Sequence, residues 1–145
     1  MPKELYFEDI DEGYEIPPLI RDITRRRILK YADAGGDYNP IHVNEEFGKK
    51  VGLGGIIAHG MLSYAFLVQM MTNWLPKPTY LKRLRAEFRG MVFPGDVITC
   101  KGRVVKKYVK DGENYIECEV WCENQKGEKT TIGTAVATLP SRGQK

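Results

Sequence analysis

The stretch GMLSYAFLVQMMTNWL, residues 60–75, decides the fold of this chain. It contains no charged residue, and its apolar side chains cover nearly the whole circumference of a helix. Pro76 follows and ends the helix, because proline lacks the amide hydrogen that a helix needs. A helix that is apolar all round is typically buried all round. We therefore predict one long, buried central helix, from Gly60 to about Leu75.

Beyond the central helix, the apolar residues change from a helical period to alternation. Leu84, Ala86 and Phe88 share one face of an expected strand, and the charged residues between them share the other. Turn-forming residues separate three further alternating segments, and Asp111-Gly112 is typical of a tight hairpin. These segments are residues 98–104, 116–122 and 130–139. We predict an antiparallel meander of four strands whose apolar face packs on the helix.

The region before the central helix contains a shorter predicted helix and several loops. Thr24 is a suitable N-cap for a helix over residues 25–34, and Gly35-Gly36 ends it. Pro17-Pro18 is typical of an edge strand or a lead-in segment. Together these elements predict an α+β fold in a single domain, residues 1–145. A single sheet covers only part of a helix, so we expect a second subunit or the N-terminal segment to cover the remainder.

The composition excludes several classes of protein. With 145 residues the chain has the length of one domain, and 22 basic against 19 acidic residues give a net charge of only +3. This balance argues against a nucleic-acid-binding protein, and the absence of an apolar run of about 18 residues argues against a membrane-spanning helix. The acidic N-terminal segment does not resemble a signal peptide. The three cysteines are therefore expected to be reduced thiols in a cytoplasmic protein.

Only two histidines are present, His42 and His59, and both lie in the loop-rich region before the central helix. His42 belongs to a short polar group with Asp37 and Asn39, flanked by glycine and proline. A carboxyl group and an imidazole at this range are the parts of a general acid–base pair near neutral pH. The alternative is a purely structural role, which most lone histidines have. For catalysis we expect both groups in a buried apolar pocket beside the central helix.

Gly60 stands where the central helix begins. The first N–H groups of a helix have no intrahelical acceptor and lie at the positive end of its dipole, and glycine has no side chain to block a ligand. The Gly60 N–H is therefore a candidate donor to a developing oxyanion. The alternative is that glycine only relieves crowding where the helix meets the sheet. The bare sequence favours neither interpretation over the other.

Three stretches of the chain resemble one known family. Residues 31–42, YADAGGDYNPIH, resemble the signature of the MaoC-like, R-specific hydratase/dehydratase family, whose core is Gly-Asp-x-Asn-Pro-apolar-His. Residues 52–62, which end in AHGML, match the second motif of the family at the usual distance, since Gly60 is 18 residues beyond His42. A looser similarity covers residues 88–96, which end in a Pro-Gly-Asp turn. The matches together run from about Tyr31 to Asp96.

The resemblance implies a hot-dog fold, in which an antiparallel sheet wraps one long central helix. It also implies a homodimer or a higher assembly of dimers, with active sites at the subunit interface. The implied reaction is the reversible hydration of trans-2-enoyl thioesters, or the dehydration of (3R)-3-hydroxyacyl thioesters. The substrate would be carried by coenzyme A or by acyl carrier protein, and no metal or redox cofactor is expected.

The resemblance assigns roles to four residues. Asp37 and His42 would be the catalytic acid–base pair, without a decision on which of them moves the C2 proton. Asn39 would orient the water or its neighbours. The Gly60 N–H would bind the thioester carbonyl oxygen. Ala65 stands where some short hydratases of the family carry serine, so the preference for acyl-chain length is left open.

Two rival functions keep the same fold. One is an acyl-CoA thioesterase, but such enzymes usually place a carboxylate on the central helix, and residues 60–75 contain none. The other is a non-catalytic partner subunit that binds acyl chains. The intact set of Asp37, Asn39 and His42 argues against that, because a purely structural subunit has no use for it.

Basic side chains near the first strand of the meander are candidate substrate contacts. Arg83, Arg85 and Arg89 have the chemistry to meet the phosphates of coenzyme A or the acidic surface of acyl carrier protein. The alternative is a solvated face, which is the usual role of such clusters. Binding that weakens steeply with salt would separate these two interpretations.

Overall fold

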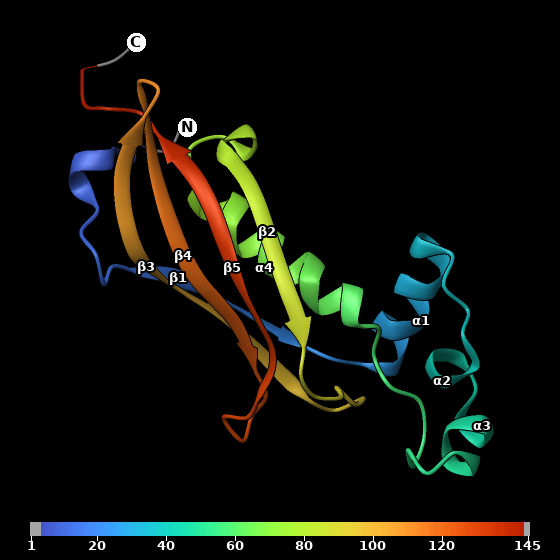
Figure 1. The fold of residues 1–145 in the computed structure, drawn as a ribbon. Coiled ribbons are helices and arrows are strands. Elements are labelled where there is room, and N and C mark those ends of the chain that lie inside the picture. The colour runs from blue at the N-terminus through green and yellow to red at the C-terminus, as the bar shows by residue number, and fades with distance from the viewer. Residues whose placement is uncertain (1–3, 144–145) are drawn as a thin grey trace.

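The computed structural model describes residues 4–143, and in it a five-stranded sheet curves around one long helix (Figure 1). The strands are β1 (Glu15–Asp22), β2 (Leu81–Phe88), β3 (Val97–Lys110), β4 (Glu113–Glu123) and β5 (Lys129–Leu139). The helices are α1 (Arg25–Gly35), α2 (Pro40–Val43), α3 (Glu45–Lys50) and α4 (Gly60–Trp74), with the short 3-10 turns η1 (Phe7–Asp9) and η2 (Pro78–Tyr80). The α+β hot-dog arrangement predicted from the sequence is confirmed.

The strand order is β1-β3-β4-β5-β2, and every neighbouring pair is antiparallel. β3, β4 and β5 form the predicted meander, and Asp111 and Gly112 make its first turn with positive φ angles of 52° and 78°. The predicted meander is wrong for β2, which pairs with β5 rather than with β3. The connection over residues 89–96 is longer than a hairpin turn, so it allows the chain to cross the sheet before β3 begins.

The helix α4 packs against the sheet through one side only. Its buried side chains are those of Leu62, Ser63, Phe66, Leu67, Met70, Met71 and Trp74. The prediction that one sheet leaves part of this helix bare is confirmed. An exposed stripe recurs at every fourth residue: Met61, Ala65, Gln69 and Asn73. One curved sheet encloses only part of a helix, and the other side of α4 is therefore open.

The helices α1, α2 and α3 form a group beyond the N-terminal end of α4, away from the sheet, which we call the helical arm, residues 24–59 (Figure 1). Each short helix begins at a side chain that accepts a hydrogen bond from the first turn. The pairs are Thr24 with the Arg27 amide, Asn39 with the Ile41 amide, and Asn44 with the Phe47 amide. Gly36 ends α1 with a left-handed φ of 72°, as the Gly35-Gly36 pair predicts.

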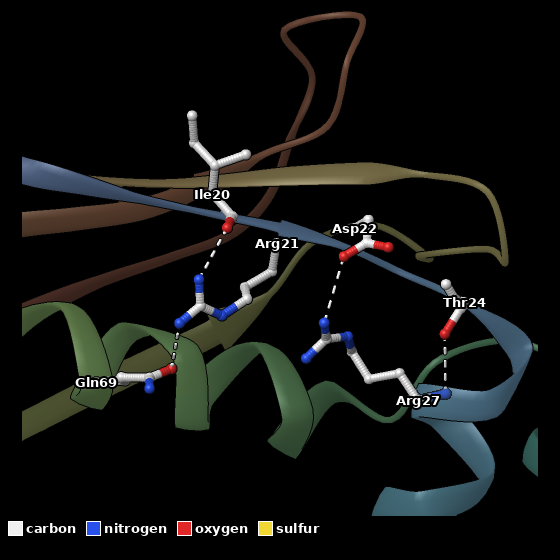
Figure 2. Close-up of polar contacts among 6 residues, drawn as sticks. All are labelled: Ile20, Arg21, Asp22, Thr24, Arg27 and Gln69. Atoms are coloured by element: carbon white, nitrogen blue, oxygen red, sulfur yellow. Dashed lines mark hydrogen bonds and ion pairs between the residues drawn. The ribbon is translucent and has the colours of Figure 1, made fainter.

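Polar contacts join β1 to α4 and also join β1 to the start of the arm (Figure 2). The Arg21 guanidinium donates to the Ile20 carbonyl oxygen at 3.0 Å and to Oε1 of Gln69 at 3.3 Å, so it bridges β1 and α4. Across the junction between β1 and α1, Nη2 of Arg27 pairs with Oδ1 of Asp22 at 3.3 Å. The Arg21 bonds thus join β1 to α4, and the Arg27–Asp22 pair joins the first turn of the arm to the end of β1.

Two expectations from composition concern thiols and membranes. Cys100, Cys118 and Cys122 are buried free thiols, as expected, and burial is the main cause that raises the pKa of Cys118 to about 12. The Cys118 thiol therefore ionises too weakly to act as a nucleophile near neutral pH. Within residues 4–143, no helix is both long enough and apolar enough to cross a membrane.

Candidate active site

His42 lies in α2, and the backbone of the segment that leads into α4 holds its ring. Nδ1 of His42 lies 2.8 Å from the Ile57 carbonyl oxygen. Because a carbonyl oxygen only accepts, Nδ1 carries the hydrogen and Nε2 keeps its lone pair in the neutral ring. His42 is only 8% exposed. It therefore offers one proton-accepting nitrogen in a defined orientation.

His59, which caps the start of α4, packs directly on His42. The two rings are stacked, with centroids 3.9 Å apart and an interplanar angle of 21°. His59 is 2% exposed, and its Nε2 donates to the Asp37 carbonyl oxygen at 2.9 Å. This residue is not among the site residues predicted from sequence. The available signal was its position, since it is the second of only two histidines and directly precedes Gly60.

Asp37 and Asn39 shape the turn between α1 and α2. Oδ1 of Asp37 accepts from the Asn39 amide at 3.1 Å, and Oδ1 of Asn39 accepts from the Ile41 amide at 3.3 Å. Asn39 thus begins the helix that carries His42. The expectation of a buried pocket is wrong for Asp37, which is exposed in the single chain, while His42 is buried. The turn lies in the arm, beyond the cover that the sheet provides.

The fold brings Asp37, His42 and His59 together. Each offers one atom that could ligate a metal ion, and these three atoms lie within 4.8 Å of one another. The lone pair of a ring nitrogen lies in the ring plane, so two nearly parallel stacked rings direct their lone pairs side by side rather than to one point. One nitrogen of each histidine is also bonded to a carbonyl oxygen. This geometry suits proton transfer better than the convergent coordination that a metal ion requires.

Gly60 is the first residue of α4, with His59 at the N-cap. Its N–H has no acceptor within the helix, and the His59 side chain makes no capping bond to the first turn. A Cβ at this position would lie 2.9 Å from two carbons of the Phe88 ring at the end of β2. The crowding interpretation of Gly60 is therefore correct. It is compatible with the interpretation of Gly60 as an oxyanion donor, because its N–H has no acceptor within the helix.

The last segment of the arm, which leads into α4, is fixed against α1 and α3. Oε1 of Glu45 pairs with the Arg25 guanidinium at 2.8 Å, and Oε2 accepts from the Ile56 amide at 3.3 Å. Gly48 of α3 approaches this segment so closely that a Cβ would overlap the Gly55 carbonyl oxygen. The Glu45 carboxylate thus connects α1 and α3 with the segment that ends at His59.

The three predicted basic contacts lie on β2 and just after it. Arg83 and Arg85 alternate with core-facing residues, so they lie on the face of the sheet opposite α4. Within residues 4–143 neither forms an ion pair, whereas the Arg89 guanidinium pairs with Glu87 at 2.7 Å. Arg89 follows Phe88, which packs on the first residue of α4. Of the three arginines, the fold brings Arg89 toward the start of α4.

The chain is similar to proteins of one family over nearly its whole length. Residues 10–138 match the family model described as "MaoC like domain". The (R)-specific enoyl-CoA hydratase of Rhodospirillum rubrum is 31% identical over 140 residues, which cover 95% of this chain and 94% of that protein.

Two solved structures share the fold. The unliganded R-hydratase PhaJ1 of Pseudomonas aeruginosa has a TM-score of 0.84 at 24% identity, over 94% of this chain and 86% of that one. A chain of the ChsH1–ChsH2 complex from Mycobacterium tuberculosis has a TM-score of 0.77 at 20% identity, over 89% of this chain and 98% of that one. Fold, family match and sequence relatives agree, and this chain belongs to the family of MaoC-like domains.

Proposed function

We propose that this protein is a hydro-lyase that adds water across the C2–C3 double bond of trans-2-enoyl thioesters. The reverse reaction removes water from (3R)-3-hydroxyacyl thioesters. The observation that carries the proposal is the grouping of Asp37 and His42 at the N-terminal end of α4, where the Gly60 amide has no acceptor within the helix. Hydration needs a proton acceptor, a proton donor and a donor to the thioester oxygen. The R. rubrum relative is named for this reaction.

The hydrogen bond of His42 to the Ile57 carbonyl supports its role as a proton acceptor. Nε2 has the lone pair, so it can take a proton from the water whose oxygen bonds to C3. The C2 carbon takes up a proton from one of the two acid–base groups, and the proton removed from water restores the pair to its starting state, so that one water molecule is consumed in total. In the reverse direction C2 loses a proton and the C3 hydroxyl leaves as water. Asp37 and His42 together hold the water on one face of the double bond, which gives the R product.

The amide of Gly60 would stabilise the charge that develops on the thioester carbonyl oxygen. A donor aimed at that oxygen before the reaction needs no rearrangement when the charge appears, and one such donor contributes about 10²- to 10³-fold in rate. The positive end of the α4 dipole acts in the same direction.

The test uses purified full-length protein and a short enoyl thioester, crotonyl-CoA. We expect loss of the enoyl-thioester absorbance and formation of (R)-3-hydroxybutyryl-CoA. Asp37→Asn should abolish most of the turnover, whereas the matched control Glu46→Gln, an exposed carboxylate of α3, should leave it intact. Release of free thiol without hydration would instead establish a thioesterase. Inactivity in both assays, also with long-chain substrates, would mean that the chain alone is a non-catalytic subunit.

We further propose that two copies of this chain form a homodimer that encloses the site. The exposed stripe of α4, the exposure of Asp37 and two apolar side chains near the site support this assembly. Phe88 and Met91 are 52% and 51% exposed. A second copy over this side would cover them and complete a pocket. Sedimentation equilibrium should give twice the mass of one chain, and a monomer that is fully active would contradict the proposal.

For the substrate carrier we propose coenzyme A or acyl carrier protein, with phosphate or acidic contacts from Arg83, Arg85 and Arg89. KM should then rise steeply with salt. Addition of water transfers no electrons, so we propose that the reaction uses no redox cofactor. Because the stacked histidine rings do not direct their lone pairs to one point, we also propose that it uses no metal ion. Three free thiols in the sheet support a cytoplasmic location.

A further inference from the structure

We propose that His59 is a positioning residue that holds Asp37 and His42 in their working arrangement, a role that rests on the proposed hydration. His59 contacts both members of the pair with different parts of its ring. The ring face lies on His42, with centroids 3.9 Å apart, and Nε2 donates to the Asp37 carbonyl oxygen at 2.9 Å. One buried side chain at the start of α4 thus sets the position of the acid–base pair relative to the helix.

Neither partner is held as firmly without His59. The His42 ring has one hydrogen bond, from Nδ1 to the Ile57 carbonyl oxygen, and the stacked ring of His59 prevents rotation about that bond. The Asp37 carboxylate bonds to the amide of Asn39, two residues away. The hydrogen bond from His59 to the Asp37 backbone connects this exposed turn to the start of α4, and the Tyr31 ring of α1 packs edge-on against His59 beside it.

The second nitrogen of His59 indicates that the residue is present for more than stability. Nδ1 is buried and has no hydrogen-bond partner among residues 4–143. A buried acceptor without a partner destabilises a fold, and an apolar ring of similar shape would fill the same space without that loss. The ring is better explained by what its face and its Nε2 do for His42 and Asp37. His59 also directly precedes Gly60, so it connects the acid–base pair to the proposed oxyanion donor.

Two substitutions separate the two contacts. His59→Phe keeps a ring to stack on His42 and removes the donor to Asp37. His59→Gln keeps an amide donor that reaches the place of Nε2 and removes the ring. We expect each variant to lower kcat for crotonyl-CoA by about 10- to 100-fold, with KM changed far less, as for other residues that orient catalytic groups. Ile116→Val, a conservative change at a buried position in β4, is the stability control and should lower Tm without changing kcat.

Nitrogen-15 NMR of the imidazole rings gives a readout that does not depend on activity. The chain has only two histidines, so both rings can be assigned in untagged protein. We expect opposite tautomers, with the hydrogen on Nδ1 in His42 and on Nε2 in His59, because each of these nitrogens faces a carbonyl oxygen. In His59→Phe, His42 should keep its tautomer. In His59→Gln, where the stacking ring is lost, His42 should show a mixture of both.

The outcomes separate this proposal from the proposed function. A kcat within about 2-fold of wild type in both folded variants, with only Tm reduced, would overturn the positioning role. An unchanged His42 tautomer in His59→Gln would overturn the role of the stack. If the wild-type protein hydrates no enoyl thioester, the proposed function fails, while the tautomer of His42 in the two variants still decides whether His59 positions it.

Discussion

The sheet and the helical arm of this protein are held together in different ways. The strands pair along continuous ladders, and their inner side chains, among them Val104, Ile116 and Ala135, have no exposed surface. The arm is built from short helices that begin at capping side chains and bury few residues. Asp37, His42 and His59 all lie on the arm. Because the helices of the arm bury few side chains, we expect individual polar contacts to align these three residues, so that substitutions in the arm change catalysis and substitutions in the sheet change stability.

We expect the largest fall in kcat from a substitution of His42 in the arm. His42→Asn removes the proton-accepting nitrogen and should lower kcat for crotonyl-CoA hydration by about 10²- to 10⁴-fold, as for other general acid–base groups. The asparagine amide occupies the place of Nδ1 and can still donate to the Ile57 carbonyl, so Tm by calorimetry should change far less than kcat. Turnover near the wild-type level would show that His42 is a structural residue.

The sheet should respond in the opposite way. Ile116→Ala empties space in the fully buried centre of β4 and should lower the free energy of unfolding by about 2–5 kcal/mol. Urea denaturation measures this loss, and kcat at a temperature well below the transition should equal that of wild type. A large fall in kcat of the folded variant would mean that the sheet and the site are coupled, and would contradict the comparison.

A pair of glycine substitutions, one in the sheet and one in the arm, tests the difference between the two regions further. Gly102 in β3 and Gly48 in α3 both lack room for a Cβ, which would meet the Ile16 side chain at 2.8 Å in one case and overlap the Gly55 carbonyl oxygen in the other. Gly48→Ala forces the backbone apart and should lose about 1–3 kcal/mol of stability by overpacking, whereas Gly102→Ala displaces only the ends of the Ile16 and Met70 side chains and should lose less. Only Gly48→Ala should also lower kcat, because it displaces the segment that leads to His59. Equal effects on kcat would remove the distinction between the two regions.

The smallest expected effect concerns one cap of the arm. Asn44→Ala removes the acceptor for the Phe47 amide at 3.0 Å and should cost about 0.5–2 kcal/mol. Asn44→Asp keeps the capping oxygen and is the matched control, with stability close to wild type. Thermal unfolding of the two variants side by side measures the difference. If the alanine variant is as stable as the control, local capping does not hold the arm.

Local features of this fold could be predicted from the sequence with good accuracy. The helix α4 begins at Gly60, as predicted, and ends within one residue of the predicted end. The cap at Thr24, the end of α1 at Gly35-Gly36 and the turn at Asp111-Gly112 are also confirmed. Each of these depends on residues that are neighbours in the chain, so their effect on the backbone can be read without knowing the rest of the molecule.

The candidate site could be predicted only in part. The signature around Asp37, Asn39 and His42 located the turn, because these residues lie within six positions of one another. His59 was missed, although its ring contacts His42 and its Nε2 binds the Asp37 backbone. These contacts join segments about twenty residues apart, and no local pattern reports a stack between two such rings.

The sequence alone predicted the central helix, the cap and end of α1, the hairpin turn and the family signature, because helix periodicity, strand alternation and capping act over a few residues. The tertiary structure decided which strand pairs with β2, which side of α4 stays open and which side chains meet at its N-terminal end. Those outcomes depend on how the long connection over residues 89–96 crosses the sheet and how far one curved sheet can reach around a helix. Both are properties of the packed chain, set by the burial of apolar surface among segments distant in sequence.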